Sequence, residues 1–228
     1  MNDDSHALAN FSGLARLFPL PNVVLFPHVV QPLHVFEPRY RQLTADSLAD
    51  DQMLAMALLR PGWEDDYEGR PPLYSVACLG RIITHKRLAD GRFIILLRGL
   101  SRIRLGEEVE SENSYRSAHA ELLSDVPSLS LDEARQVRGR LSELVMARFS
   151  GPDEEKVQLR EMLEGEVSIG PLCDHLCYRF PFPVEDKQQF LEEIDVGLRA
   201  RRLLEMLEGL TETQAAESRK FPPDFSVN

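Results

Sequence analysis

The segment Cys173-Asp174-His175-Leu176-Cys177 gathers thiol, imidazole and carboxylate groups, the side chains that most often hold zinc. On a helix, Cys173 and Cys177 would share one face, whereas His175 would point away from it. The sequence has no second ligand pair at zinc-finger spacing. We therefore predict a buried helix face here and assign no metal ligand.

The residue patterns of several enzyme classes are missing from the sequence. It contains no G-x-x-x-x-G-K-[ST] or G-x-G-x-x-G phosphate loop, no G-x-S-x-G nucleophile and no H-E-x-x-H zinc motif. The six histidines are scattered, and acidic runs such as Glu64-Asp65-Asp66 are typical of solvated charge. The sequence therefore predicts no catalytic residue and no cofactor.

Aromatic and apolar side chains are the first candidates for contacts with a partner. Trp63 and Tyr67 lie in a segment rich in Gly, Pro, Asp and Glu, and aromatic side chains often anchor binding surfaces. Covering the core is the alternative role for both. Leu25 and Phe26 belong to a proline-bounded apolar run, where a strand edge could pair with an extended peptide.

Arginines are the second group of candidates. Arg98, Arg102 and Arg104 occupy even positions of one apolar run and would share a strand face, provided that no bulge at Gly99 switches the faces. Together with His85-Lys86-Arg87 they could bind an anion or RNA. A solvent-facing polar stripe is the alternative.

The elements that position these residues change type near residue 124. Before it, short β-type runs alternate with turns, and Asp90-Gly91 predicts a hairpin because glycine accepts the positive φ of such a turn. After it, apolar residues recur at three- and four-residue steps, which predicts helices. The predicted strands are residues 18–27, 29–36, 54–59, 76–85, 93–105 and 115–123. The predicted helices are 38–49, 131–149, 153–164, 169–180, 185–194 and 196–210.

Charge and composition restrict the partners. Residues 1–105 carry 12 Lys/Arg and 11 Asp/Glu, whereas residues 106–228 carry 14 and 26, so the second half has a net charge of −12. An acidic half repels phosphate backbones, which disfavours nucleic acid outside a local patch of the first half. The polar N-terminus, the lack of a long apolar run and three cysteines lead us to expect a cytoplasmic protein without a membrane span.

Several segments resemble the substrate-recognition domain at the N-terminus of Lon proteases. They follow the order of that family from its opening strand to the hairpin. The segments are Leu20-Pro21-Asn22-Val23-Val24-Leu25-Phe26-Pro27-His28, Pro32-Leu33-His34-Val35-Phe36-Glu37-Pro38-Arg39-Tyr40, Val76-Ala77-Cys78-Leu79-Gly80-Arg81-Ile82, Asp90-Gly91-Arg92-Phe93 and Leu97-Arg98-Gly99-Leu100-Ser101-Arg102-Ile103. Residues 172–207 are more loosely similar to the helical segment that follows, so the resemblance covers about residues 16–210.

The resemblance implies an α+β fold, with a PUA-like β-barrel in residues 14–124 and a helical bundle in residues 125–210. We expect flexible tails at 1–13 and 211–228. The ATPase and Ser–Lys protease domains of full Lon have no counterpart here, which implies a stand-alone, non-catalytic module.

The resemblance also implies protein or peptide clients, and the leading hypothesis is an adaptor for unfolded or specific clients. RNA or small-molecule binding by a PUA-like barrel is the alternative. The sequence leaves the client and the oligomeric state open.

Overall fold

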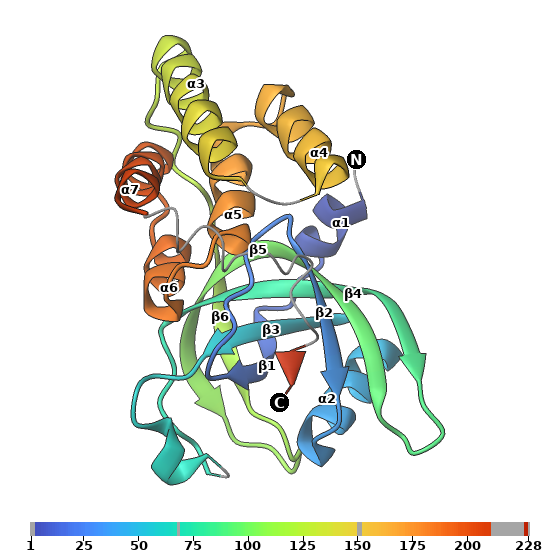
Figure 1. Cartoon of the computed structure of the whole chain (residues 1–228). Helices are drawn as coiled ribbons and strands as arrows, with labels where there is room; N and C mark the ends of the chain where they lie inside the picture. The colour runs from blue at the N-terminus through green and yellow to red at the C-terminus, as the bar shows by residue number, and fades with distance from the viewer. Residues whose placement is uncertain (1–2, 68, 150–151, 211–225, 228) are drawn as a thin grey trace. The chain divides into compact units, whose positions relative to one another are not determined.

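The protein consists of two compact units, one built mainly of strands and one of helices (Figure 1). The strand unit runs to Ser124 and includes the short strand β7 (Ser226–Val227), whereas the helix unit begins at Asp125. The computed structural model describes residues 3–67, 69–149, 152–210 and 226–227. The predicted α+β class is confirmed, because a mixed sheet and a set of helices are both present.

The sheet of the strand unit closes on itself. Strands β4, β3, β1, β6 and β5 pair in that order, and β5 pairs with β4 again. Within this ring β1 and β3 are parallel, and the other pairs are antiparallel. The bounds are β1 (Leu14–Leu20), β3 (Met53–Leu58), β4 (Val76–Arg87), β5 (Phe93–Val109) and β6 (Ser117–Leu123). Strand β2 (Val30–Val35) lies outside the ring and pairs with β5.

One core cluster of the strand unit is made largely of small side chains. Alternate strand positions point to the same face. Many of these positions carry alanine, which lets neighbouring strands close around a narrow core. The cluster contains Ala15, Leu17, Met53, Ala55, Ala57, Ala77, Leu79, Leu100, Ile103, Ala118 and Ala120.

The β4–β5 hairpin is formed as the sequence predicts. Gly91 has a φ of 84°, and the Leu88 N–H donates a hydrogen bond to the Arg92 carbonyl oxygen at 2.8 Å. Farther along, Gly80 pairs with Gly99 and Leu79 pairs with Ser101, so Leu100 is an extra residue in β5. This bulge switches the faces of β5 beyond Gly99.

The first strand begins earlier than the sequence predicts. Strand β1 ends at Leu20, and residues 21–29 form no strand although Val24, Leu25 and Phe26 are buried. The prediction of a strand over 18–27 is wrong for its second part, because prolines at 21 and 27 cannot donate to a sheet ladder.

The structure describes part of each of the two predicted tails, residues 1–13 and 211–228. Helix α1 (Asp3–Ala9) forms in the first one and packs near β5, where Asp4 pairs with Arg98 at 3.6 Å. In the second one, residues 211–225 and 228 lie outside the described residues.

The helix unit follows the predicted periodicity closely. Helix α3 begins at a capping box, in which Ser130 and Glu133 satisfy each other's backbone N–H groups. Helix α5 packs against α6 and α7, and α3 packs against α4 and α7. Cys173 and Cys177 are fully buried on α5, as expected for a packed helix face. The bounds are α3 (Leu131–Arg148), α4 (Asp153–Glu164), α5 (Ile169–Arg179), α6 (Val184–Glu192) and α7 (Val196–Gly209).

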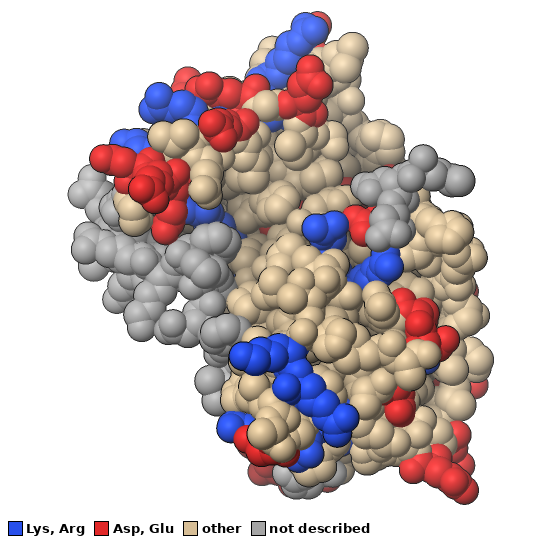
Figure 2. Space-filling view, turned by 90° about the vertical axis from the view of Figure 1, so that its right-hand side faces the viewer, with Lys and Arg blue, Asp and Glu red and all other residues tan. Residues whose placement is uncertain are grey.

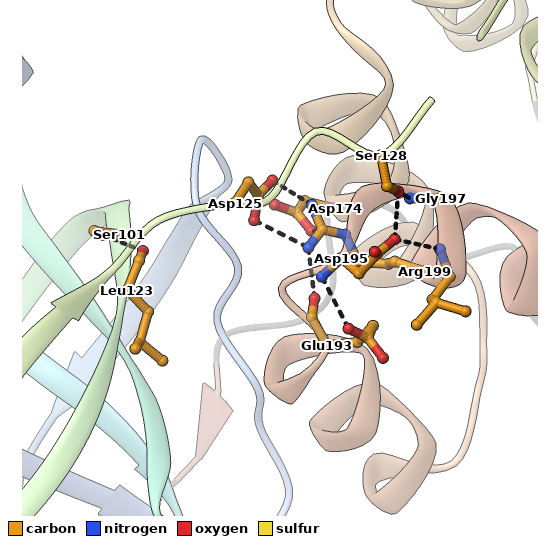
Figure 3. Close-up of polar contacts among 10 residues, drawn as sticks. Ser101, Leu123, Asp125, Ser128, Asp174, Glu193, Asp195, Gly197 and Arg199 are labelled. Carbon is orange, nitrogen blue, oxygen red and sulfur yellow. Dashed lines mark hydrogen bonds and ion pairs between the residues drawn. The ribbon is translucent and has the colours of Figure 1, made fainter. Parts of the chain in front are cut away.

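A buried arginine connects α7 with α5 and with the segment that begins the helix unit (Figure 3). Arg199 is fully buried. Its Nη1 donates to Asp125 Oδ1 at 3.0 Å and to the Glu193 carbonyl oxygen at 2.6 Å. Its Nε lies 3.4 Å from Oδ1 of Asp174, which is also buried. The positive charge is therefore shared between two carboxylates inside the unit.

Lys187 on α6 gives the helix unit a pH-dependent stability. Its Nζ donates to the Tyr178 carbonyl oxygen at 2.9 Å, and burial lowers the pKa of Lys187 from 10.5 to about 8. The unfolded chain therefore holds this proton more tightly than the folded chain, so the free energy of unfolding should rise between about pH 8 and 10.5.

Replacing Lys187 with methionine should consequently stabilise the helix unit by about 1 kcal/mol near neutral pH, and the gain should vanish near pH 10.5. Denaturant titrations followed by far-ultraviolet circular dichroism at several pH values measure this difference. Lys86→Met, at an exposed position of β4, is the control that should leave the pH profile unchanged. A gain from Lys187→Met that persists above pH 10.5 would contradict the buried-charge explanation.

Candidate partner-binding site

Trp63 and Tyr67 form a half-buried aromatic pair on the loop between β3 and β4. Trp63 begins the short helix η1 (Trp63–Asp66), and Gly62 before it has a φ of 89°, which glycine adopts without strain. The two rings meet edge to face with centroids 5.4 Å apart. The Tyr67 hydroxyl donates to Glu37 Oε1 at 2.8 Å, so the loop is tied to the start of α2 (Pro38–Ala49).

Arg39 holds this loop against the body of the strand unit. Its guanidinium carbon lies 4.8 Å from the centroids of both the Tyr40 and the Tyr67 rings. Its Nε donates to Glu37 Oε2 at 2.9 Å, and its Nη1 donates to the Tyr67 carbonyl oxygen at 3.2 Å. The Tyr40 ring in turn stacks on Phe18 of β1 at 4.2 Å. A continuous stack therefore runs from the sheet to the aromatic pair.

The pKa values of Tyr67, Tyr40 and Arg39 are all raised in the folded chain. Burial, reinforced by Glu37, raises the pKa of Tyr67, and burial raises the pKa of Tyr40 well above its ordinary value. Burial lowers the pKa of Arg39, but Tyr40, Glu37 and Tyr67 raise it by more. The tyrosines thus stay neutral hydrogen-bond donors beside a permanent positive charge.

A cavity of about 350 Å³, here called the Arg39 cavity, opens beside this stack. Besides Arg39 it presents two more guanidinium groups, those of Arg70 and Arg116, and both lie near Glu108. The hydrogen bond from Arg116 lowers the pKa of Glu108. The cavity is lined by Pro19, Arg39, Tyr40, Gly69, Arg70, Asn113, Ser114, Tyr115 and Arg116.

The arrangement offers charged and aromatic groups to a bound partner. Paired guanidinium and carboxylate groups can meet the polar groups of a peptide, and the Trp63–Tyr67 pair offers an aromatic surface next to them. Among the described residues that line the cavity, none is a nucleophile with an adjacent base. Within the described part of the chain, no group of three His, Cys, Asp or Glu side chains is placed to hold a metal ion.

The structure moves two predicted residues away from any surface. Leu25 and Phe26 are each 0% exposed, so neither side chain can contact a partner in this conformation. This corrects the prediction that they lie beside an exposed strand edge. The segment follows β1 as an irregular buried stretch, and its side chains fill the core.

The three predicted arginines do not form one surface. The bulge at Leu100 turns Arg98 to one face of β5 and Arg102 and Arg104 to the other. Arg102 is only 2% exposed, whereas Arg104 is exposed and Arg98 pairs with Asp4. The basic stripe required for the RNA hypothesis is therefore absent from β5.

Basic side chains gather instead near the tip of the β4–β5 hairpin. Figure 2 shows Lys and Arg side chains on the lower part of the face that carries this hairpin. Lys86 and Arg87 are exposed there, and the Arg41 guanidinium lies against Gly91 of the turn. Arg102 is buried and so does not contribute to this patch, and the single basic surface that the RNA hypothesis needs does not form.

The sequence indicated Trp63 and Tyr67 but gave no indication of Arg39, Arg70 or Arg116. Arg39 is separated from Tyr67 by 28 residues, and Arg116 is separated from Pro71, whose carbonyl oxygen it binds, by 45 residues. The available signal for Arg39 was its place beside Tyr40 in a segment that resembles a known family. Whether Trp63 and Tyr67 bind a partner stays a prediction.

Comparison with known proteins assigns the fold to a family. The family model of the ATP-dependent protease La (LON) substrate-binding domain matches residues 15–209. The chain belongs to this family. Lon protease 2 of Myxococcus xanthus is 28% identical over 191 residues, which cover 84% of this chain and 23% of that protein. The Lon protease of Anaeromyxobacter dehalogenans is 27% identical over 191 residues, which cover 84% of this chain and 22% of that protein. The chain thus spans about a quarter of the length of these Lon proteases.

Solved structures of Lon N-terminal domains share the fold. The N-terminal domain of Mycobacterium avium complex Lon protease has a TM-score of 0.68 at 18% identity. The superposition covers 87% of this chain and 100% of the chain of that structure. The Lon N-terminal domain protein from Xanthomonas campestris has a TM-score of 0.61 at 21% identity, and the superposition covers 84% of this chain and 96% of the chain of that structure. Among the described helices of this Lon-type domain, none is both long and apolar enough to cross a membrane.

Proposed function

We propose that this Lon-type substrate-binding domain is a non-catalytic recognition module that holds exposed segments of unfolded or specific client proteins at the Arg39 cavity and the Trp63–Tyr67 pair. The observation that carries the proposal is an aromatic pair held beside a cavity by the stack of Arg39 and Tyr40 on Phe18. The volume of about 350 Å³ also falls within the range of small-molecule sites. Such sites are mostly apolar, however, and the charged lining favours a peptide.

Trp63 is the single tryptophan of the chain and therefore reports directly on this site. We expect its emission to change in a saturable manner when oxidised insulin B chain, a tryptophan-free unfolded polypeptide, is added. A tightly folded protein without tryptophan should cause no change, because it exposes no extended segment.

Trp63→Ala should weaken the binding of labelled insulin B chain about tenfold, since an aromatic side chain that becomes buried against a bound peptide typically contributes more than 1 kcal/mol. Tyr67→Ala should have a similar effect, because it also removes the ring that faces Arg39. Fluorescence anisotropy of the labelled peptide measures both variants. Tyr74→Ala, on a half-buried tyrosine at the end of the same loop, is the matched control and should bind as the parent does.

Two results would contradict the proposal. Equal affinities for Trp63→Ala, Tyr67→Ala and the parent would show that peptides bind elsewhere. Turnover of a peptide or nucleotide by the purified chain, abolished by changing one of its own side chains, would show that the module is catalytic.

A further inference from the structure

Strand β2 presents an edge of the sheet. The ring of strands closes without it, and among the described strands β2 pairs on one side with β5 and on the other with the two-residue strand β7. Its outer backbone groups from Val30 to Pro32 are therefore not part of a ladder with any described strand. Such a row of backbone groups is a template for another extended chain.

The hydrogen-bond pattern identifies which backbone groups face outward. The Gly99 N–H of β5 donates to the Val29 carbonyl oxygen at 2.8 Å, so Val29 faces β5. Because bonded and non-bonded pairs alternate in an antiparallel ladder, Val30, Pro32 and His34 turn their backbone groups away from β5. A proline at this outward position is tolerated because no ladder bond is lost.

On β2 this edge is guarded by Pro32 alone. Exposed sheet edges are usually guarded by prolines or charged side chains, and β2 carries no charged side chain. The end of β4, by contrast, exposes Lys86 and Arg87 along its own edge. Strand β7 already occupies part of the β2 edge, where it runs parallel with Leu33 opposite Ser226 and His34 opposite Val227.

We propose that the outer edge of β2 is a strand-addition site for extended peptide segments, and that Ser226–Val227 of this same chain is its resident occupant. A client peptide that uses this edge must displace that segment. The edge is a second recognition surface, and it does not depend on the Arg39 cavity.

The first test weakens the resident segment in the full chain. Prolines at both positions, Ser226→Pro with Val227→Pro, cannot donate to a ladder and should free the edge. A labelled synthetic peptide of residues 221–228 should then bind about tenfold or more tightly than it binds the parent, in which the attached segment competes at high effective concentration. Ser226→Thr with Val227→Ile retains strand propensity and should bind the peptide as weakly as the parent.

The second test changes the edge itself in the proline-paired chain. His34→Pro removes an outward N–H and leaves the bonds to β5 intact, so it should abolish peptide binding while the circular dichroism spectrum and the melting temperature stay the same. His34→Val, which keeps the N–H, should bind normally. Equal binding by these two variants, or no gain from the proline pair, would overturn the proposal. Neither result would change the insulin B chain titration at Trp63, so failure here is distinct from failure of the proposed function.

Discussion

Replacing Gly99 with alanine should lower the free energy of unfolding of the strand unit by about 4 kcal/mol or more. A Cβ atom there would lie 2.0 Å from the carbonyl oxygen of Phe26 and 2.8 Å from its carbonyl carbon, which are backbone atoms that cannot rotate away. The Gly99 backbone cannot shift freely either. Its N–H donates to Val29 and its carbonyl oxygen accepts from His28, both at 2.8 Å.

Gly106 on the same strand is the matched control for Gly99. A Cβ atom at Gly106 would meet its nearest neighbour at 3.5 Å, so Gly106→Ala should change the stability by less than about 1 kcal/mol. Denaturant titrations followed by the emission of Trp63 report on the strand unit, because this tryptophan belongs to it. Similar midpoints for the two variants would show that the segment around Phe26 can move away from β5.

Local signals explain which parts of the fold could be predicted from the sequence. The hairpin depends on a glycine that accepts a positive φ at Gly91, and the helices depend on apolar spacing within one helix face. Neither signal needs information about distant residues. The resemblance to Lon domains added the order of the elements, and the family match over residues 15–209 confirms the resemblance.

The bulge at Leu100 could not be predicted in the same way, because it depends on a tertiary contact. Gly99 lacks a side chain where the Phe26 backbone crosses β5, and the extra residue follows this close approach. One residue of shift reverses every later side chain, so Arg102 lies on the opposite face of β5 from Arg98, although its even spacing from Arg98 suggested one shared face.

The tertiary contacts of the candidate site could not be predicted from local sequence either. Composition alone identified the loop with Trp63 and Tyr67, since glycine, proline and acidic residues break regular structure. What fixes the position of the loop is the stack on Arg39 and the hydrogen bond to Glu37, both from the start of α2. Apolarity likewise marked Leu25 and Phe26 as important, but it could not distinguish an exposed strand edge from a buried irregular segment.

Replacing Arg199 with methionine should destabilise the helix unit by about 3–5 kcal/mol, the usual cost of removing one partner from a buried ion pair. Burial lowers the pKa of Arg199, but Asp174 and Asp125 raise it by more, so the guanidinium is charged in the folded chain. Without it, Asp174 would remain buried, at 1% exposure, with its charge uncompensated by Arg199 (Figure 3).

The double variant Arg199→Met with Asp174→Leu distinguishes a missing charge from a missing contact. If the uncompensated carboxylate causes the loss, removing both charges should restore part of the stability, because an apolar pair of similar volume can replace a buried ion pair. Arg201→Met, at an exposed position of the same helix, should cost less than about 1 kcal/mol. Far-ultraviolet circular dichroism follows the helix unit, while Trp63 emission should show the strand unit unchanged. A loss for Arg199→Met no larger than that for Arg201→Met would mean that the network does not hold α5, α7 and the Asp125 segment together.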